Sequence, residues 1–392
     1  MSRYSPFALA LTLGALLAGV ARAQCAPRAD APPGVWDTAN ATLPPATKPT
    51  PDGIALMRGI ACRADLAVDD GVVEFELAPP SGAFAGIAFR MASSADYEIV
   101  YLRSGADGRW SAMQYQPVYE GESTWQLYHG DGYEADVPAR TARTADGWTR
   151  VRLVIAGQRA DVYVGDDSSP ALRIRDLKRT RTRGPIAIWA AGSEVTSPTV
   201  VRALRVRPLG DQTLANVAPE KPAIGQLVRW RVSRRFAAPD SIFFADRLSN
   251  EARDAALNGR MAAAEPSGLE NLTAFVGNAG GPQRTNVFGG AGWGVAYASV
   301  TLQSDRAQTR RLSLSYSEAI GVYVDGALVY VGDNRYDARF KGDLGIVGVE
   351  GETVALRLHA GDNQVVLAIA DKAFGWGFRA RLDSLDAVRV TP

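Results

Sequence analysis

The chain has 392 residues, of which 46% are hydrophobic and 22% are charged, with 43 basic and 42 acidic side chains. This composition is typical of a globular protein, and a formal charge of +1 excludes the strongly basic surface that binding to nucleic acid or anionic lipid requires. We therefore expect no nucleic-acid partner and no insertion into a membrane.

The N-terminus has the features of a cleavable signal peptide. A basic start is followed by an apolar run from Phe7 to Val20, and Ala-Arg-Ala at positions 21–23 forms an A-x-A cleavage site before Gln24. The run is too short for a membrane span, which needs about 20 apolar residues. We predict that residues 1–23 are removed and that the protein is secreted or periplasmic.

Two cysteines, Cys25 and Cys62, lie beyond the predicted cleavage site. In an oxidising compartment a lone pair most simply forms one disulfide, which here would tie the new N-terminus to the first domain. With only two histidines besides this pair, no zinc site can be assembled at a familiar spacing. We expect no cofactor.

Short runs of alternating or β-branched residues follow a Pro-, Ala- and Thr-rich segment that ends near Pro51. Such runs, separated by Gly, Asp and Pro without helical periodicity, predict the strands of a β-sandwich. The predicted strands are Val72–Leu77, Gly86–Met91, Tyr97–Arg103, Trp148–Ile155, Ala160–Val164, Pro185–Ala190 and Val200–Val206.

Residues 209–226 contain few large apolar side chains and two prolines, which indicates a linker between two domains, 24–208 and 227–392. A second strand-rich block follows, in which Asp325-Gly326 predicts a type I′ hairpin turn. Asn250–Ala264 is the one stretch with a helical pattern, with Ser249 as its cap. The strands predicted in this block are Leu227–Val232, Arg311–Tyr316, Gly321–Val324, Leu328–Val331, Thr353–Leu358 and Val365–Ala370.

The stretches GVVEFELAPPSGAFAGIAFR, DYEIVYLR and DGWTRVRLVIAGQRADVYV resemble the concanavalin A-like lectin/glucanase superfamily. The resemblance is to its laminin-G-like jelly rolls and its 3-keto-disaccharide-hydrolase-type domains. The superfamily contains lectins, adhesion modules, glycosidases and lyases, so the likeness implies a fold rather than an activity. Further along, SEAIGVYVDGALVYVGDNRYDARFKGDLGIVG and FGWGFRARL are similar to galactose-binding-like jelly rolls. Together these likenesses imply an all-β protein of two antiparallel jelly-roll sandwiches.

The segment from Tyr97 to Tyr133 is dense in the side chains that sugar sites use, namely aromatic rings and planar polar groups. On the predicted strand Tyr97–Arg103, Tyr97, Tyr101 and Arg103 share one face, while Glu98 points to the other. An inter-sheet core lined by tyrosines is the alternative interpretation. We predict a ligand surface made of Tyr97, Tyr101, Arg103, Gln114, Tyr115, Trp125 and His129, with Arg103 as its most important member.

Glycoside cleavage would also need two carboxyl groups about 5–10 Å apart. Glu74 and Glu76 alternate on one strand, but the third acid of the glucanase pattern is missing, so we interpret them as solvent-facing residues of an edge strand. Glu98 and the loop residue His129 remain as weak catalytic candidates.

In the second domain, the loop 333–337 after the Asp-Gly hairpin offers Asp333, Asn334 and Tyr336 to a sugar or to a structural Ca²⁺. A turn held by its own side-chain hydrogen bonds is the alternative. Trp376, between two glycines, fits a ligand contact and a core position equally well. We predict a carbohydrate-binding protein, with a glycoside hydrolase as the alternative.

The predicted disulfide and cleavage site can be tested together by intact mass spectrometry of secreted material, with and without reductant. We expect a mature chain that begins at Gln24 and gains two mass units on reduction, because Cys25 and Cys62 are oxidised. Two free thiols in the native protein would contradict the pairing.

Overall fold

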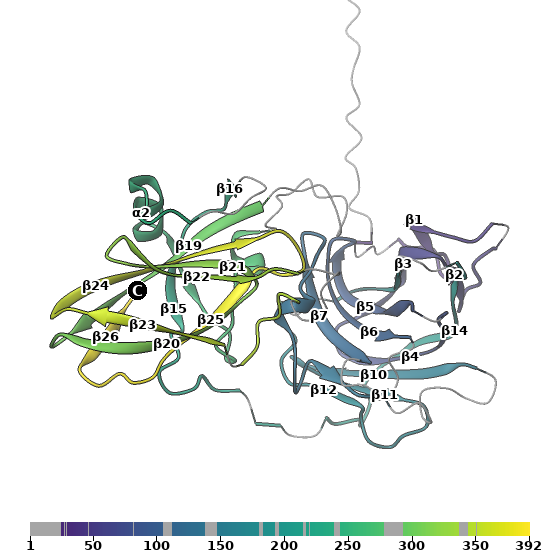
Figure 1. The fold of residues 1–392 in the computed structure, drawn as a ribbon. Helices are drawn as coiled ribbons and strands as arrows, with labels where there is room; N and C mark the ends of the chain where they lie inside the picture. Colours follow the sequence, from purple (N-terminus) through teal and green to yellow (C-terminus); the bar gives the residue numbers. More distant parts are fainter. Residues whose placement is uncertain are drawn as a thin grey trace, which may run out of the picture.

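The computed structural model describes residues 25–392 apart from 27, 29, 46, 81, 105–111, 138–146, 180–182, 193–195, 215–216, 219, 239–243, 278–292, 337–343 and 350. The predicted signal peptide lies outside these residues, so it and the secreted or periplasmic location stay predictions. The fold consists of antiparallel strands with a few short helices, which confirms the predicted all-β class (Figure 1). Within the described residues, no helix is long and apolar enough to cross a membrane.

The strands up to residue 207 form two facing sheets, which we call the N-terminal sandwich. One sheet has eight strands in the order β1-β3-β13-β5-β6-β7-β8, with β9 paired to β7, and the other has six in the order β12-β11-β10-β4-β14-β2. The eight are β1 (Asp37–Thr42), β3 (Arg58–Val68), β13 (Gly184–Ala191), β5 (Phe84–Ser93), β6 (Asp96–Arg103), β7 (Met113–Tyr119), β8 (Glu122–Ser123) and β9 (Glu134–Ala135). The six are β12 (Leu172–Ile174), β11 (Arg159–Val164), β10 (Thr149–Ala156), β4 (Gly71–Ala78), β14 (Thr199–Arg207) and β2 (Ile54–Leu56).

The later strands form the C-terminal sandwich, in which β16 and β26 pair with β19 beside the path β17-β15-β19-β24-β21-β22. Its second sheet runs β18-β25-β20-β23. The first sheet comprises β17 (Arg260–Ala263), β15 (Arg229–Val232), β19 (Trp293–Ser304), β24 (Gly361–Asp371), β21 (Glu318–Val324), β22 (Ala327–Asn334), β16 (Phe236–Ala238) and β26 (Val388–Thr391). The second comprises β18 (Glu270–Asn271), β25 (Gly377–Leu382), β20 (Gln308–Tyr316) and β23 (Glu352–Leu358). The domain boundaries at 208 and 227 stay predictions.

Alternation along the strands builds the core of the N-terminal sandwich. Val73, Phe75 and Leu77 of β4 point inward and pack in one cluster with Ile87 and Phe89 of β5. Their neighbours along β4, Glu74 and Glu76, therefore point outward, as a period of two requires.

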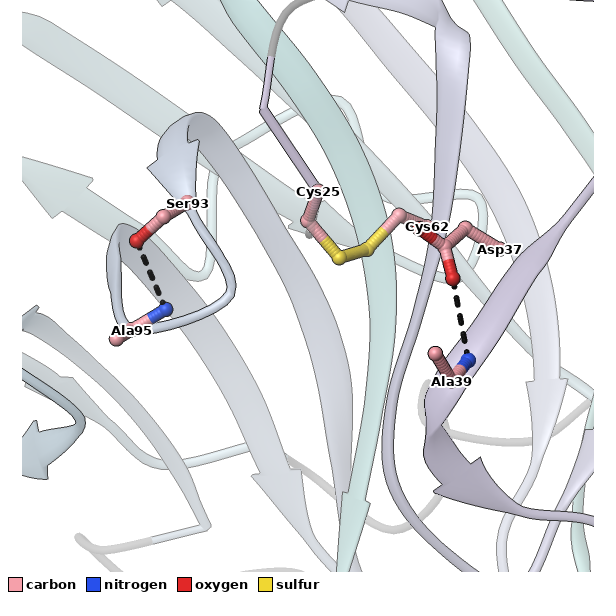
Figure 2. Close-up of a disulfide and its surroundings, with 6 residues drawn as sticks. All are labelled: Cys25, Asp37, Ala39, Cys62, Ser93 and Ala95. Carbon is pink, nitrogen blue, oxygen red and sulfur yellow. Dashed lines mark hydrogen bonds between the residues drawn. A yellow bond between two sulfur atoms is a disulfide. The ribbon is translucent and has the colours of Figure 1, made fainter. Parts of the chain in front are cut away.

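The eight-stranded sheet is also covered on its other face, which we call the outer face. Here Tyr97, Ile99 and Tyr101 of β6 form a second buried cluster with Cys25 and Cys62. Cys25 and Cys62 are joined, as the sequence predicted, and Figure 2 shows the bond where the N-terminal segment meets β3. The disulfide thus holds the start of the described chain against the outer face.

The predicted hairpin turn is confirmed between β21 and β22. Asp325 and Gly326 have φ values of 50° and 79°, so both adopt the left-handed conformation that a type I′ turn needs. The predicted helix is shorter than expected, because α2 (Asn250–Leu257) ends at Asn258 and residues 260–263 pair with β15 instead. Ser249 caps α2 by accepting a hydrogen bond from the Ala252 N–H. The other helices within the described part of the chain are the 3₁₀ turn η1 (Trp125–Leu127) and α3 (Leu272–Val276).

The two sandwiches are joined by hydrogen bonds around η1, which follows β7 and β8. Gln126 is fully buried, and its side-chain N–H groups donate to the Leu344 carbonyl (2.8 Å) and to the Glu318 carboxylate (3.2 Å). Its backbone N–H donates to Phe374 (3.1 Å), and its carbonyl accepts from Val347 (2.8 Å). One residue of the N-terminal sandwich thus binds three segments of the C-terminal part.

The two sandwiches also approach closely at Gly375. A Cβ atom there would lie 2.9 Å from the Thr124 Cα and the Leu127 side chain, and its φ of 116° is one that other residues rarely adopt. Leu269 and Val347, although late in the sequence, are buried in the core of the N-terminal sandwich. The junction is therefore a packed interface.

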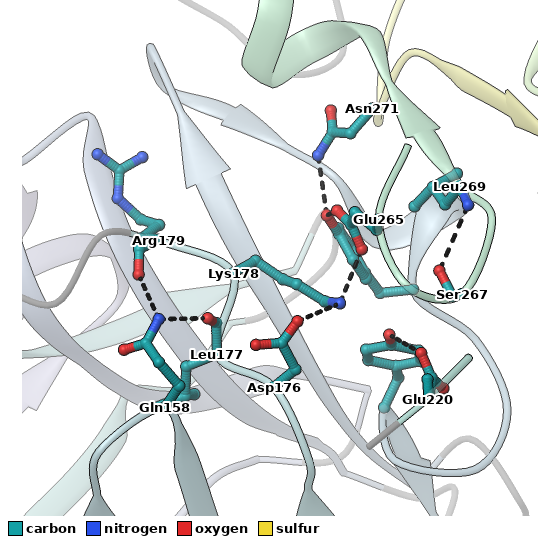
Figure 3. Close-up of polar contacts among 12 residues, drawn as sticks. Gln158, Asp176, Leu177, Lys178, Arg179, Glu220, Glu265, Ser267, Leu269 and Asn271 are labelled. Atoms are coloured by element: carbon teal, nitrogen blue, oxygen red, sulfur yellow. Dashed lines mark hydrogen bonds and ion pairs between the residues drawn. The ribbon is translucent and has the colours of Figure 1, made fainter. Parts of the chain in front are cut away.

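An ion pair with polar partners lies at the centre of this interface (Figure 3). The Lys178 ammonium lies 2.7 Å from the Glu265 carboxylate, and the Lys178 side chain is only 3% exposed. The Tyr128 hydroxyl donates to Glu265 (2.6 Å) and accepts from the Asn271 amide (2.8 Å). Burial alone would lower the pKa of Lys178, but Glu265 raises it above its ordinary value, so the lysine stays charged.

Removing the cation should weaken the protein through this interface. We expect Lys178→Met to lower the free energy of unfolding by about 2–4 kcal/mol, because Glu265 loses its buried partner. Asp176→Asn is the control, since Asp176 is 43% exposed and should contribute less than about 1 kcal/mol. Urea denaturation of the three proteins measures the difference, and equal stabilities would show that the Lys178–Glu265 pair does not stabilise the fold.

Candidate functional site

The predicted ligand residues of β6 lie where the alternation places them. Tyr97 and Tyr101 are on the outer face, and Glu98 points into the core, where the Tyr115 hydroxyl and the Arg179 N–H both donate to its carboxylate (2.6 and 2.9 Å). Burial raises the pKa of Glu98 above its ordinary value. Since Glu98 is fully buried and hydrogen-bonded, it has the surroundings of a structural carboxyl group.

Aromatic rings and one guanidinium meet at one end of the outer face. The Arg103 guanidinium lies 5.2 Å from the centre of the Phe84 ring, and the Phe84 and Tyr101 ring centres are 6.0 Å apart. Tyr101 in turn lies 5.5 Å from Trp189 of β13. Phe84, Arg103 and Trp189 are half-buried, so part of each is accessible to a ligand.

Gln114 links these rings to the next part of the surface. It is fully buried, and its carbonyl oxygen accepts a hydrogen bond from the Tyr101 hydroxyl. Its amide donates to the backbone carbonyls of Trp125 (3.0 Å) and Tyr128 (2.8 Å). Gln114 therefore positions η1, which carries Trp125. We call Phe84, Tyr101, Arg103, Gln114 and Trp189 the outer-face group.

Trp125 brings together side chains from both sandwiches. Its ring lies 5.7 Å from His129, 5.9 Å from Tyr336 and 5.7 Å from Phe374, and the last two rings are 5.2 Å apart. Trp125 and Tyr336 are half-buried. We call Trp125, His129, Tyr336 and Phe374 the junction group. Two sets of residues that were predicted separately, one in each domain, thus form one cluster.

Two carboxylates flank the junction group. Glu134 of β9 lies 3.0 Å from the His129 ring nitrogen, and its side chain is 2% exposed. Glu318 begins β21 and accepts hydrogen bonds from Gln126 (3.2 Å) and from the backbone N–H of Tyr336 (3.3 Å). The pKa of Glu318 is raised to about 7 by burial, which outweighs the hydrogen bonds and the nearby Arg335.

Glu318 was missing from the sequence-based prediction. Its φ of 64° is unusual for a residue other than glycine, and such conformations are often found at functional sites. In the sequence, Glu318 is an acidic residue just before the predicted strand Gly321–Val324. The hydrogen bonds that its carboxylate accepts come from Gln126 and Tyr336, which approach it only in the folded chain.

Three predicted residues lie apart from the two groups. Tyr115 faces the opposite way, in the core between the sheets, and Trp376 is fully buried in the core of the C-terminal sandwich. Tyr97 is on the outer face but only 7% exposed, and Tyr101 and Gln114 of the outer-face group are buried at least as deeply, at 4% and 0%, so these two support the half-buried side chains of that group. These positions agree with the alternative interpretation of tyrosines and tryptophans as core residues.

The hairpin loop contributes Tyr336 to the junction group, while its other described polar residues bind within the fold. Arg335 pairs with Asp333 and lowers its pKa, and the Asn334 amide donates to the Tyr316 carbonyl (3.1 Å). Asp337 lies outside the described residues. Among the described residues, no three His, Cys, Asp or Glu side chains are grouped to hold a metal, and the structural Ca²⁺ stays a prediction.

Glu74 and Glu76 do not lie on an edge strand, contrary to the sequence-based interpretation. β4 is flanked by β10 and β14, and Arg150 and Arg202 both donate to the Glu76 carboxylate. These two arginines lower the pKa of Glu76, which therefore stays ionised. The strand is internal because β14, more than a hundred residues later in the chain, pairs beside it.

The raised pKa of Glu318 makes a specific prediction for stability. A carboxyl group with a folded-state pKa of about 7, above its ordinary 4.5, stabilises the fold at low pH and loses that contribution as the pH rises through 7. The free energy of unfolding of the unaltered protein should therefore fall by about 2–3 kcal/mol between roughly pH 5 and 8.5. In Glu318→Gln this fall should be absent. Urea denaturation at both pH values measures it, with the exposed Glu251→Gln as control. A pH dependence unchanged in Glu318→Gln would refute the assignment.

No family model and no curated protein matches the chain. Among solved structures, the carbohydrate-binding module CBM66 from Bacillus subtilis is similar at 10% identity, with 44% of this chain and 94% of that chain covered and a TM-score of 0.31. A protein of unknown function with a galectin-like fold, from the same species, matches at 12% identity over 44% and 89% of the two chains (TM-score 0.32). The GH43 protein BlXynB from Bacillus licheniformis matches at 15% identity over 38% and 29% (TM-score 0.26). These likenesses, at 10–15% identity, assign no ligand to this chain.

Proposed function

We propose that the protein binds a carbohydrate on the surface formed by the outer-face group and the junction group. The observation that carries the proposal is the meeting of two half-exposed rings, Trp125 and Tyr336, beside the polar side chain of His129. Aromatic rings stack on the C–H faces of sugars, and neighbouring polar groups bind their hydroxyls. Both kinds of group are needed for a sugar, and both are present here.

The polar groups of this surface are held in place before a ligand arrives. Gln114 fixes the backbone of Trp125, Glu134 contacts His129, and Arg103 lies over Phe84. A preorganised site loses less conformational entropy on binding, which favours affinity. The arrangement therefore supports recognition of a hydroxylated ligand by several fixed contacts.

Glycoside cleavage is the second candidate, and Glu318 is the observation that favours it. A pKa of about 7 keeps a carboxyl group partly protonated at neutral pH, as a general acid requires. Cleavage also requires a second carboxyl group, for which Glu134, beside His129, is the candidate. Glu318→Gln would then abolish product formation while leaving binding unchanged.

The test is binding of the purified protein to a panel of neutral glycans, with product analysis in the same wells. We expect Trp125→Ala and Tyr336→Ala each to weaken binding about 10- to 100-fold, because a buried aromatic contact is lost. Arg103→Ala should also weaken binding, through loss of a polar contact.

Trp148→Ala is the matched control, since Trp148 is also half-buried but lies beside Arg202 on the other sheet of the N-terminal sandwich. It should bind as the unaltered protein does. Full affinity in folded Trp125→Ala and Tyr336→Ala proteins would place the site elsewhere.

A further inference from the structure

A second polar site lies on the six-stranded sheet of the N-terminal sandwich, on the face turned away from the core. A cleft of about 380 Å³ is formed there by outward side chains of β4, β10 and β14 and by the loop after β11. Its charged lining residues are Glu74, Glu76, Arg150, Arg152, Asp166, Asp167 and Arg205. The volume lies within the range of small-molecule sites.

A bulge in β14 adjoins this cleft. The pairing of β14 with β4 shifts between Arg202 and Arg205, and Ala203, which lines the cleft, has a left-handed φ of 55°. An extra residue in one strand bends it and redirects its side chains, and an alanine in this conformation is strained. Bulges of this kind are frequent next to binding and active sites.

Most charges around the cleft are paired. Glu76 binds Arg150 (3.0 Å) and Arg202 (2.7 Å), and Arg150 also binds Asp166 (2.6 Å). Ion pairs of this kind are typical of an exposed sheet face and need no ligand.

Two arginines differ from this pattern. Arg152 and Arg205 lie on either side of Glu74 in the sheet register, but Glu74 pairs with Arg207 instead (3.2 Å). Among the residues that the structure describes, neither Arg152 nor Arg205 forms an ion pair with a carboxylate; Arg152 lies 3.8 Å from the centre of the Tyr163 ring. The Arg152 guanidinium is thus turned toward β11, whereas Arg205 lines the cleft next to Glu74 in the register, with donors available to a ligand.

We propose that this cleft binds a sugar that carries a carboxylate, that is, a uronic acid, with Arg205 holding the carboxylate and Arg152 donating to a hydroxyl farther along the sugar. A guanidinium group donates two parallel hydrogen bonds that match a carboxylate in shape and charge. The acids of the lining disfavour a bare polyanion, but Glu74 and Asp167 can accept hydrogen bonds from sugar hydroxyls. A uronic acid carries both the carboxylate and the hydroxyl groups that these side chains would bind.

The experiment is isothermal titration of the purified protein with methyl glucuronide, methyl galacturonide and methyl mannuronide. We expect at least one to bind, and Arg205→Ala to weaken it about 10- to 100-fold, because a charge-assisted hydrogen bond to the carboxylate is lost. Arg152→Ala should weaken binding less, since it removes only a hydrogen bond to a hydroxyl. Arg205→Lys should retain part of the affinity, since it keeps the charge without the paired donors.

Three controls distinguish uronide binding in this cleft from binding at the junction group and from unspecific anion binding. Arg229→Ala, an exposed arginine of β15, should bind uronides unchanged, and so should Trp125→Ala, which alters the junction group alone. Methyl glucoside should bind far more weakly than the uronide, and acetate should not compete at the same concentration. Thermal melting of each variant confirms that it is folded.

Several outcomes would overturn the proposal. Binding of none of the three uronides, equal binding of glucoside and uronide, or full affinity in a folded Arg205→Ala variant would each contradict it. Competition by acetate as effective as by uronide would indicate a simple anion site. Because Trp125→Ala acts on the other site only, failure of one proposal is distinguishable from failure of the other.

Discussion

The arrangement of the molecule depends on one requirement, that polar groups buried between the two sandwiches find partners. Lys178 and Glu265 come from different sandwiches, and each would be costly to bury without the other. Tyr128 and Asn271 complete the network, and Gln126 binds the opposite sandwich with both its side chain and its backbone. Such contacts are directional, so they fix the relative orientation of the two sandwiches as well as their attachment.

The junction group exists because of that orientation. Trp125 is next to Gln126 in the sequence, and the backbone N–H of Tyr336 donates to the same Glu318 carboxylate that Gln126 binds. The contacts that hold the sandwiches together therefore also position the two rings. If the rings bind sugar, binding and docking are thermodynamically linked, since a ligand that contacts both rings stabilises the docked arrangement.

Local patterns in the sequence predicted much of the fold. Alternation placed Tyr97, Tyr101 and Arg103 on one face of β6, and Asp325-Gly326 predicted its hairpin, because both signals depend on neighbours in the chain. Glu318 could not be found in this way, since its burial is created by residues about 190 positions away. The same reason explains the position of β4, whose neighbour β14 comes from a distant part of the chain. Helix propensity failed beyond Leu257, where pairing with β15 replaced the helix.

The Cys25–Cys62 bond has a consequence for how the protein responds to mechanical load. β1 and β2 lie within the covalent loop that this bond closes, whereas β3, which carries Cys62, is the second strand of the eight-stranded sheet, between β1 and β13. A pulling force applied at the N-terminus passes through the disulfide directly to β3, and the loop between the two cysteines carries no tension. The force then acts along β3, against its hydrogen bonds to β1 and β13, while β1 and β2 cannot be peeled away one at a time. Reduction would lengthen the load path by the whole loop and make β1 the first strand to be stretched.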